Sequence, residues 1–416
     1  TNTECEARIV AIVVDGEQVD QIDAGQEGRI VLDKTPFYAE KGGQVGDTGV
    51  LETEAACAQV TDTQEPEKGL IAHTVTMENG SLAVGQNVHA SIDAIRRARI
   101  CRNHSATHIL HWALRKVLGD HVKQAGSLVA PNRLRFDFTH YEAMAPEQIA
   151  EVERLANEKI MENHTVRAYE TSLAAAREAG VMALFGEKYG ENVRVLDMEG
   201  FSQELCGGTH VSATSEIGLV KITSETSVGA NLRRIEAVTS FDALEYLNHV
   251  ETELKAVADK LHVPLFDAAD RCAANVAQLK ELQTKMKRNR EAVAADGITK
   301  VLESVVEAKG GYPLIVANVG QMDTSQLRNM WDVMRSRMSA PGAVVLAATN
   351  GDAALLLAAG TPEAVDAGFD AGAVIKNIAP CVNGGGGGKP AMAQAGGKNA
   401  AGVDEALEAA RALLLA

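Results

Sequence analysis

Aromatic side chains, cysteines and long apolar runs are all scarce in this 416-residue sequence. Aromatic residues make up 4% of the chain, against 46% hydrophobic residues in total, so the cores are built mainly from Ala, Val and Leu. No run of ~18 or more apolar residues is free of charges, which argues against a membrane-spanning helix. Six cysteines at irregular spacing do not form a disulfide framework, and a reducing cytoplasm fits them best.

An excess of positive charge is also missing. The formal net charge is −16 at pH 7, which argues against loose, nonspecific binding of nucleic acid. A local basic patch is still compatible with this balance, because affinity depends on where the cations lie. The segment 95–104, IRRARICRNH, is one such patch.

Residues 1–91 consist of short strand-like runs separated by turn residues. The run EARIVAIVVDG ends in the turn pair Asp15-Gly16, and Pro36 and several glycines interrupt the runs that follow. This pattern predicts a small β-barrel. The chain begins TNTECEARIV, without Met and without a basic segment followed by an apolar core. We therefore expect an excised fragment or a processed product with no secretory signal.

Residues 92–240 alternate between helical and strand patterns and predict an α/β domain. A helix is expected from Ile92 to Leu118, capped by Ser91 or Asp93 and ended by Gly119. Residues 128–140 alternate like one strand, and residues 145–163 have the apolar face of an amphipathic helix. Three further strands are predicted at residues 193–199, 218–227 and 233–240, on either side of the segment CGGTH.

Residues 241–300 predict a helical arm, and residues 301–416 predict a second α/β domain. In the arm, leucines and valines recur at spacings of three and four and Pro264 breaks the run, which is typical of antiparallel helices or a short coiled coil. Such an arm either joins two copies of a homodimer or folds back onto its own chain. In the final domain Asn350-Gly351 predicts a hairpin between two strands. The fold class expected for the whole chain is therefore α+β multidomain.

A glycine-rich segment, residues 383–399, lies between the strands and the last helix of this domain. We expect it to be a loop whose five consecutive glycines lead into Lys389. Glycine amides can face an anion at close range, so contact with phosphate or an RNA backbone is one interpretation, and a plain flexible loop is the other. It is not a Walker loop, because no Ser or Thr follows Lys389.

Two pairs of residues, each four positions apart, predict a metal site. His104 and His108 lie on one face of the expected helix, and Cys206 and His210 enclose a tight Gly-Gly-Thr turn. Together they form a tetrahedral nitrogen and sulfur set, typical of Zn²⁺. Other ligand choices stay open at this point, because Cys101 and His111 lie near the same helical face. A zinc protease is excluded, since Ser105 stands where that motif has Glu.

These segments together resemble a known family. HSATH, VKQAGSL, RLRFDFTH, CGGTHV and RRIEAVT resemble the editing domain of alanyl-tRNA synthetases and their free-standing relatives. FYAEKGGQVGDTG is similar to the barrel that precedes that domain, and GGGGGKPAMAQAGG is similar to the terminal domain, a relative of RNA-binding domains. The matches run in order along the whole chain. The resemblance is to the C-terminal portion of the family, without its aminoacylation domain.

The resemblance implies an aminoacyl-tRNA deacylase that removes serine or glycine from mischarged tRNA(Ala). His104, His108, Cys206 and His210 would hold zinc, and Gln124 would line the substrate pocket and help to select serine. Four protein ligands saturate a tetrahedral ion, so we expect that one ligand is loose or that the substrate enters a fifth position. The arm and the final domain imply a homodimer that binds tRNA. The alternative is a zinc-stabilised tRNA-binding and dimerisation module without catalysis.

Several residues have a functional and a structural interpretation. Asp137 could activate water or could be structural, and Arg233 and Arg234 could meet phosphates or could be a solvated pair. Gly42-Gly43-Gln44 is similar to the tripeptide of peptide-release factors, but its strand-like flanks fit the synthetase barrel. The chain has Lys41 where the family often has Ser, and SVGANLRR also differs from the family's commoner form. Neither departure lies at the position of a proposed ligand.

Overall fold

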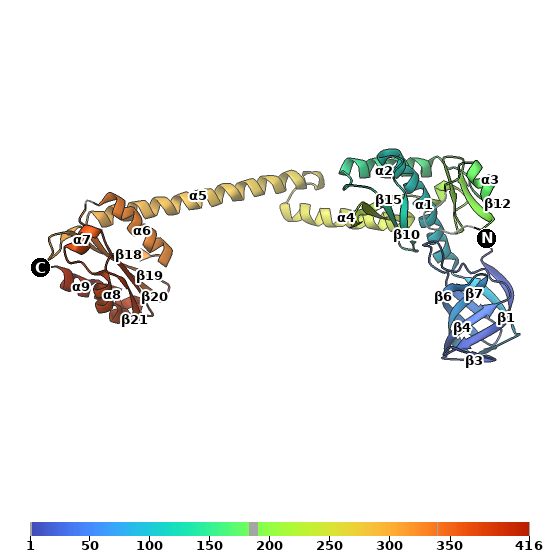
Figure 1. The fold of residues 1–416 in the computed structure, drawn as a ribbon, viewed down its shortest axis with the longest axis horizontal. Coiled ribbons are helices and arrows are strands. Elements are labelled where there is room, and N and C mark those ends of the chain that lie inside the picture. Colours follow the sequence, from blue (N-terminus) through green and yellow to red (C-terminus); the bar gives the residue numbers. More distant parts are fainter. Residues whose placement is uncertain (1, 183–189, 339, 416) are drawn as a thin grey trace. The chain divides into compact units, whose positions relative to one another are not determined.

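The computed structural model describes residues 2–182, 190–338 and 340–415 and is a mixed α+β architecture (Figure 1). It divides into two compact units, Thr1–Lys260 and Leu261–Ala416. The expected α+β multidomain class is confirmed, and the finer division into four domains stays a prediction. In the part of the chain that the structure describes, no helix combines the length and apolarity needed to cross a membrane.

The predicted barrel is confirmed in the first unit. Strands β1, β4, β7, β6, β5 and β9 pair in that order, and β9 pairs back with β1, which closes the ring. Its core consists of inward-facing apolar side chains, among them Ile9, Ile30 and Val75. The strands have the following bounds: β1 (Glu4–Val14), β2 (Glu17–Val19), β3 (Gln21–Asp23), β4 (Glu27–Leu32), β5 (Gly49–Glu52), β6 (Cys57–Glu67), β7 (Leu70–Asn79), β8 (Ser81–Ala83) and β9 (Asn87–Ile92).

Helices α1, α2 and α3 and two sheets follow the barrel within the same unit. One sheet has the order β10-β11-β16-β15, and the other has the order β12-β13-β14. The apolar faces of α1 and α2 share one core with the first of these sheets. The bounds are α1 (Ala94–Leu118), β10 (Gln124–Val129), β11 (Leu134–Thr139), α2 (Pro146–Met161), β12 (Val166–Ser172), α3 (Leu173–Glu178), β13 (Asn192–Met198), β14 (Ser202–Leu205), β15 (Val220–Gly229) and β16 (Leu232–Thr239).

The Asp93 cap and the Gly119 end predicted for the first helix are confirmed, but the helix begins at Ala94 rather than Ile92, which belongs to β9. The single strand predicted at residues 128–140 is wrong. The Asp93 side chain accepts a hydrogen bond from the Arg96 amide and caps α1, and Gly119 ends it at φ 112°. Residues 124–139 instead form two antiparallel strands, β10 and β11, and the Ala130 amide donates to the Arg133 carbonyl across the turn. The alternation of polar and apolar residues continues through Pro131 and therefore hides this turn.

The predicted helical arm corresponds to α4 (Ser240–Leu261), in the first unit, and α5 (Ala268–Leu302), in the second. The chain leaves the helical path at Pro264, where a short 3-10 turn begins. Apolar side chains recur along each helix and are exposed: Leu244, Leu247, Val250, Leu254 and Val257 on α4, and Val276, Leu279, Leu282 and Met286 on α5. Pairing of these helices with each other or with a second copy stays a prediction.

The second unit contains a six-stranded sheet of order β17-β18-β19-β20-β22-β21. Alternate residues of β19 face two cores: Val345 packs with α8 and α9, and Val344 packs with α6 on the other side. The predicted hairpin between β19 and β20 is confirmed. The bounds are β17 (Val306–Glu307), β18 (Pro313–Gln321), α6 (Thr324–Arg337), β19 (Ala343–Asn350), β20 (Ala353–Gly360), α7 (Pro362–Asp366), α8 (Ala371–Ile378), β21 (Gly384–Lys389), β22 (Met392–Gly397) and α9 (Val403–Leu414).

The glycine-rich segment is not the loop that we predicted. Gly384–Lys389 forms β21, an edge strand that pairs with β22. A β-carbon at Gly386 would lie 2.0 Å from the Gln394 carbonyl oxygen of the paired strand, so this backbone path requires glycine. The usual depletion of glycine in strands predicts a loop here, and the close approach of the two backbones overrides it.

Candidate metal centre

The four residues predicted to bind metal come together in the first unit. His104 and His108 lie one turn apart on the buried face of α1, and Cys206 and His210 lie on the loop that follows β14. Their four ligand atoms all lie within 4.8 Å of one another. Two segments about a hundred residues apart in the sequence therefore form one group of donors.

The spacing of these donors fits a tetrahedral metal ion. The Cys206 Sγ atom lies 3.4 Å from His104 Nε2 and 3.3 Å from His210 Nε2. Bonds of about 2.3 Å to sulfur and about 2.0 Å to nitrogen separate S and N by roughly 3.5 Å around a tetrahedral ion. Within the described residues, His108 Nε2 is buried and has no hydrogen-bond partner. Such an orphaned nitrogen is the observation expected of a ligand atom.

Each of the three histidines contacts a different side chain through its Nδ1 atom. His104 Nδ1 lies 2.7 Å from Gln44 Oε1, and His210 Nδ1 lies 3.2 Å from Ser105 Oγ. His108 Nδ1 lies 3.0 Å from the carboxylate of Glu204, which is itself buried. Partners of this kind fix ring orientation and tautomer, and here they leave the Nε2 atoms free for an ion.

The charges of the group favour metal-binding protonation states at two ligands. Burial raises the pKa of the Cys206 thiol, but the neighbouring His104 and His210 lower it well below its usual value, so the thiolate is favoured. Burial and His104 lower the pKa of His210 to about 3, so its ring is neutral at pH 7. Thiolate and neutral imidazole are the forms that bind a metal ion.

His108 and Glu204 form a buried ion pair at the metal group. Burial lowers the pKa of His108, but the carboxylate of Glu204 outweighs it and raises this pKa to about 10. Burial raises the pKa of Glu204, and the attraction of His108 keeps it far below its usual value. The Glu204 carboxylate is also 3.3 Å from His111 Nδ1 and accepts from Ser202 Oγ at 3.1 Å. Glu204 is thus ionised, and its carboxylate contacts His108, His111 and Ser202.

Glycine at position 208 lets the loop approach α1. A β-carbon there would lie 2.1 Å from His104 Cε1 and 2.8 Å from Gln44 Oε1, whereas a β-carbon at Gly207 would have nothing within 4 Å. The Arg194 guanidinium donates to the carbonyls of Cys206 at 3.0 Å and Gly208 at 2.7 Å. The loop is therefore pressed against the histidines on one side and held by a cation on the other.

The partners of the three histidines, Gln44, Ser105 and Glu204, were not predicted as such from the sequence. Glu204 lies two residues before Cys206, where the alternation of a strand points both to the same side. This spacing from Cys206 is the sequence signal that could have identified Glu204 as a partner of the metal group. Gln44 belongs to the Gly-Gly-Gln turn of the barrel, and no spacing rule links it to residues 104–210.

The other candidate residues lie elsewhere or are already engaged. Gln124 is half-buried at the start of β10, and its amide donates to Ser127 Oγ at 3.2 Å; no described hydrogen bond joins it to the four donors. Cys101 is partly buried on α1 and outside the metal group. The carboxylate of Asp137 binds both Arg234 nitrogens at 2.7 and 2.8 Å, which supports its structural interpretation.

The arginines proposed to meet RNA all have partners within the unit. Arg233 binds the Glu225 carboxylate through two nitrogens. In the basic segment 95–104, the four arginines bind the Gly46 carbonyl, the Asp47 carboxylate, the Asp242 carboxylate and the Glu216 carbonyl, in the order Arg96, Arg97, Arg99 and Arg102. This patch therefore serves the packing of the protein rather than presenting free cations.

Three parts of the chain match described protein families. Residues 1–96 match "tRNA synthetases class II (A)", residues 193–236 match "Threonyl and Alanyl tRNA synthetase second additional domain", and residues 311–416 match the "DHHA1 domain". His210 and Cys206 lie within the second match, and His104 and His108 lie outside all three.

Similar proteins extend along nearly the whole chain. An alanine–tRNA ligase of Desulforamulus reducens is 44% identical over 97% of this chain, and one of Acetivibrio thermocellus is 43% identical over 99%. The chain spans about half the length of these relatives, 46% in both cases. A crystal structure of the C-Ala domain of Aquifex aeolicus alanyl-tRNA synthetase is 28% identical and covers 25% of this chain and 93% of its own, with a TM-score of 0.22.

The two glycines of the loop provide a test of this packing. Gly208→Ala should lower the free energy of unfolding by about 1–3 kcal/mol, because the added methyl group overlaps the His104 ring. Gly207→Ala is the matched control and should change it by less than about 0.5 kcal/mol. Urea unfolding of both variants measures the difference, and equal effects would show that the loop does not press against α1.

Proposed function

This chain belongs to the alanyl-tRNA synthetase family, with the domains of its C-terminal portion, and on that premise we propose that it is an aminoacyl-tRNA deacylase. It hydrolyses the ester that joins serine or glycine to tRNA(Ala). The observation that carries this proposal is the convergence of three imidazoles and one thiolate at a single buried point beside the matched editing segment. The whole protein's aminoacylation activity lies outside this proposal.

The four donors would hold Zn²⁺. The donor chemistry, the spacing and the orphaned His108 nitrogen all support zinc over Mg²⁺ or Ca²⁺, which prefer oxygen ligands. Bound there, the ion would supply Lewis-acid polarisation of the ester carbonyl or of a water. Glu204, Gln44 and Ser105 keep the imidazoles in place.

Selection of the substrate falls to polar groups that line the pocket for the aminoacyl end. A small synthetic site excludes serine poorly, since one added hydroxyl changes affinity little. A second site that hydrogen-bonds the serine hydroxyl rejects alanine, because alanine leaves its polar groups unpaired. We assign this role to Gln124, whose amide is half-buried and is held by Ser127. Ser127 in turn lies 3.5 Å from the Gly42 carbonyl.

The competing candidate is a non-catalytic module in which the zinc only stabilises the fold. The observation that favours it is the ligand count, because four protein donors fill a tetrahedral ion and structural sites are closed in this way. The two candidates differ in one measurable property, the release of serine from mischarged tRNA.

Two cysteines of the site region provide the test of hydrolysis. The chain is mixed with Ser-tRNA(Ala), and the release of serine is followed over time. Cys206→Ala should slow release by about 100-fold or more, since loss of a ligand exceeds the roughly 10–100-fold effect of losing an outer partner. Cys101→Ala, on the same helix as the histidines but outside the group, should retain both zinc and activity. Zinc bound without any release of serine would favour the non-catalytic module.

The second unit would bind the body of the same tRNA. The match of residues 311–416 to the DHHA1 domain supports this assignment, as does the exposed edge strand β21. The glycines of this strand carry no side chains, so an RNA backbone can approach their amides, and Lys389 is exposed at the strand's end. Two copies would associate through the exposed apolar residues of α4 and α5 in the cytoplasm.

Lys389 tests the role of this strand. Lys389→Ala should weaken tRNA(Ala) binding several-fold and reduce the salt dependence of log K by about one unit of slope, because one phosphate contact is lost. Lys309→Ala, an exposed lysine of the same unit, is the control. Filter binding over a range of salt concentrations measures both. An unchanged slope for Lys389→Ala would remove this strand from the RNA interface.

A further inference from the structure

We propose that Gln44, carried by the barrel, is a positioning residue of the metal centre. Its carboxamide aligns His104 with the CGGTH loop, so that the barrel determines how tightly the centre binds its ion. This inference rests on the proposed function in one respect, because it takes the bound ion to be Zn²⁺. It gives the barrel a part in the site that its fold alone does not imply.

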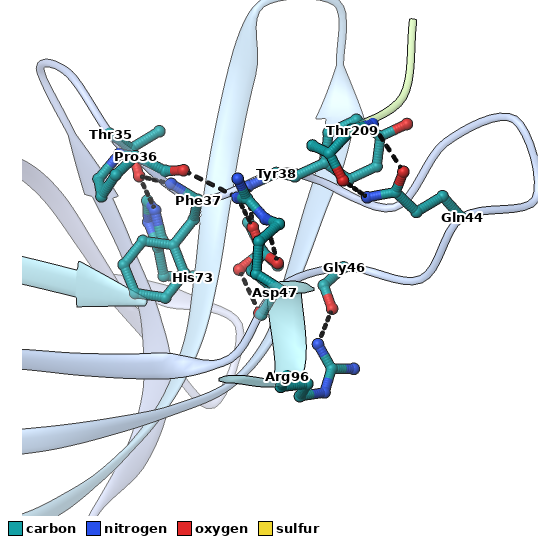
Figure 2. A network of polar contacts seen from close by, with 12 residues as sticks. Thr35, Pro36, Phe37, Tyr38, Gln44, Gly46, Asp47, His73, Arg96 and Thr209 are labelled. Atoms are coloured by element: carbon teal, nitrogen blue, oxygen red, sulfur yellow. Dashed lines mark hydrogen bonds and ion pairs between the residues drawn. The ribbon is translucent and has the colours of Figure 1, made fainter. Parts of the chain in front are cut away.

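The Gln44 side chain joins the two metal-binding segments directly. Its Nε2 donates to Thr209 Oγ1 at 2.9 Å, and its Oε1 accepts from the Thr209 amide at 2.9 Å (Figure 2). The same Oε1 lies 2.7 Å from His104 Nδ1. Gln44 is fully buried, with 0% of its surface exposed. Every polar atom of the side chain is therefore used at the site.

These contacts determine which nitrogen of His104 can bind an ion. A carboxamide oxygen only accepts hydrogen bonds, so His104 Nδ1 must carry the proton. The other nitrogen, Nε2, is then unprotonated and faces Cys206 Sγ. Buried amides keep such contacts because an unpaired polar group in a low dielectric is costly. Gln44 thus sets both the tautomer and the direction of the ring.

A tight turn places Gln44 at this point. Gly42 and Gly43 have φ values of 60° and 84°, as a two-residue hairpin turn of type I′ requires. A β-carbon at Gly43 would lie 2.3 Å from Ser127 Oγ, so the turn packs directly on β10. The Val129 amide donates to the Gly43 carbonyl at 2.7 Å, and the Val45 amide donates to the Val129 carbonyl. The turn is thereby held by the backbone of β10.

The rest of the barrel loop is anchored to α1, the helix that carries His104. The Arg97 guanidinium binds the Asp47 carboxylate through two nitrogens, and both residues are buried. It also donates to the Pro36 carbonyl at 3.0 Å, and Arg96 donates to the Gly46 carbonyl at 2.8 Å. Figure 2 shows the loop residues Pro36, Gly46 and Asp47 and the contact between Arg96 and Gly46.

The anchor and the ligand lie on the same side of α1. Arg97 precedes His104 by seven residues, which is two helical turns. The barrel loop therefore follows one face of the helix from the Arg97 contact to the His104 contact. Because both ends of this path are buried and bonded, a shift of the barrel relative to α1 would move Gln44 away from His104.

Three substitutions separate positioning from packing. Gln44→Met keeps the length of the side chain but removes its acceptor, and should weaken zinc binding by about 10–100-fold. Gln44→Glu keeps an acceptor for His104 Nδ1 and for the Thr209 amide, and should bind zinc within a few-fold of the unchanged chain. Gln18→Ala, an exposed glutamine of the same barrel, is the matched control. The zinc Kd of the full chain is measured by competition with a chromophoric chelator, with circular dichroism to confirm folding.

Each outcome of this experiment bears on the proposal. A Kd for Gln44→Met equal to that of the unchanged chain would overturn the positioning role and leave the deacylase proposal intact. Binding by Gln44→Glu as weak as by Gln44→Met would reduce Gln44 to a packing residue and also overturn it. If Gln44→Met does not fold, Gln44→Asn, one methylene shorter, should show the same weakening, and unaltered affinity would overturn the proposal. An unchanged chain that binds no zinc would overturn both proposals.

Discussion

The structure depends on bringing polar, ionisable side chains from distant segments into one buried group. Unpaired, an imidazole or a thiolate in such a place costs several kcal/mol, so it is stable only if every member has a partner. Here three nitrogens have an amide, a carboxylate and a hydroxyl as partners, and the remaining donor atoms face one another. The packing of α1, the CGGTH loop and the barrel turn follows from that requirement.

The three side chains that contact the Nδ1 atoms of the histidines differ in charge. Glu204 places a full negative charge at His108, whereas Gln44 and Ser105 offer neutral dipoles. The Nε2 atoms of the two histidines with neutral partners, His104 and His210, lie 3.4 and 3.3 Å from the Cys206 sulfur. All three partners keep their imidazole rings oriented.

Local patterns were sufficient for the barrel and for the Asp93 and Gly119 ends of α1, because caps and tight turns are encoded by neighbouring residues. The spacing of the four donors suggested a metal site, but only the family resemblance separated them from Cys101 and His111. Local patterns failed where a distant backbone decides the outcome. The glycines of β21 form a strand because β22 approaches closely, and alternation through Pro131 conceals the turn between β10 and β11. Gln44 was missed for the same reason, since its partners follow it by 60 and 165 residues.

Zinc-edge X-ray absorption on the purified chain tests the central claim most directly, because it counts the atoms bound to the ion. The account predicts one sulfur at about 2.3 Å and three imidazole nitrogens at about 2.0 Å, the set given by Cys206 and the three histidines. A first shell without sulfur, or with two or more sulfurs, would contradict it, since only Cys206 of the six cysteines belongs to the group.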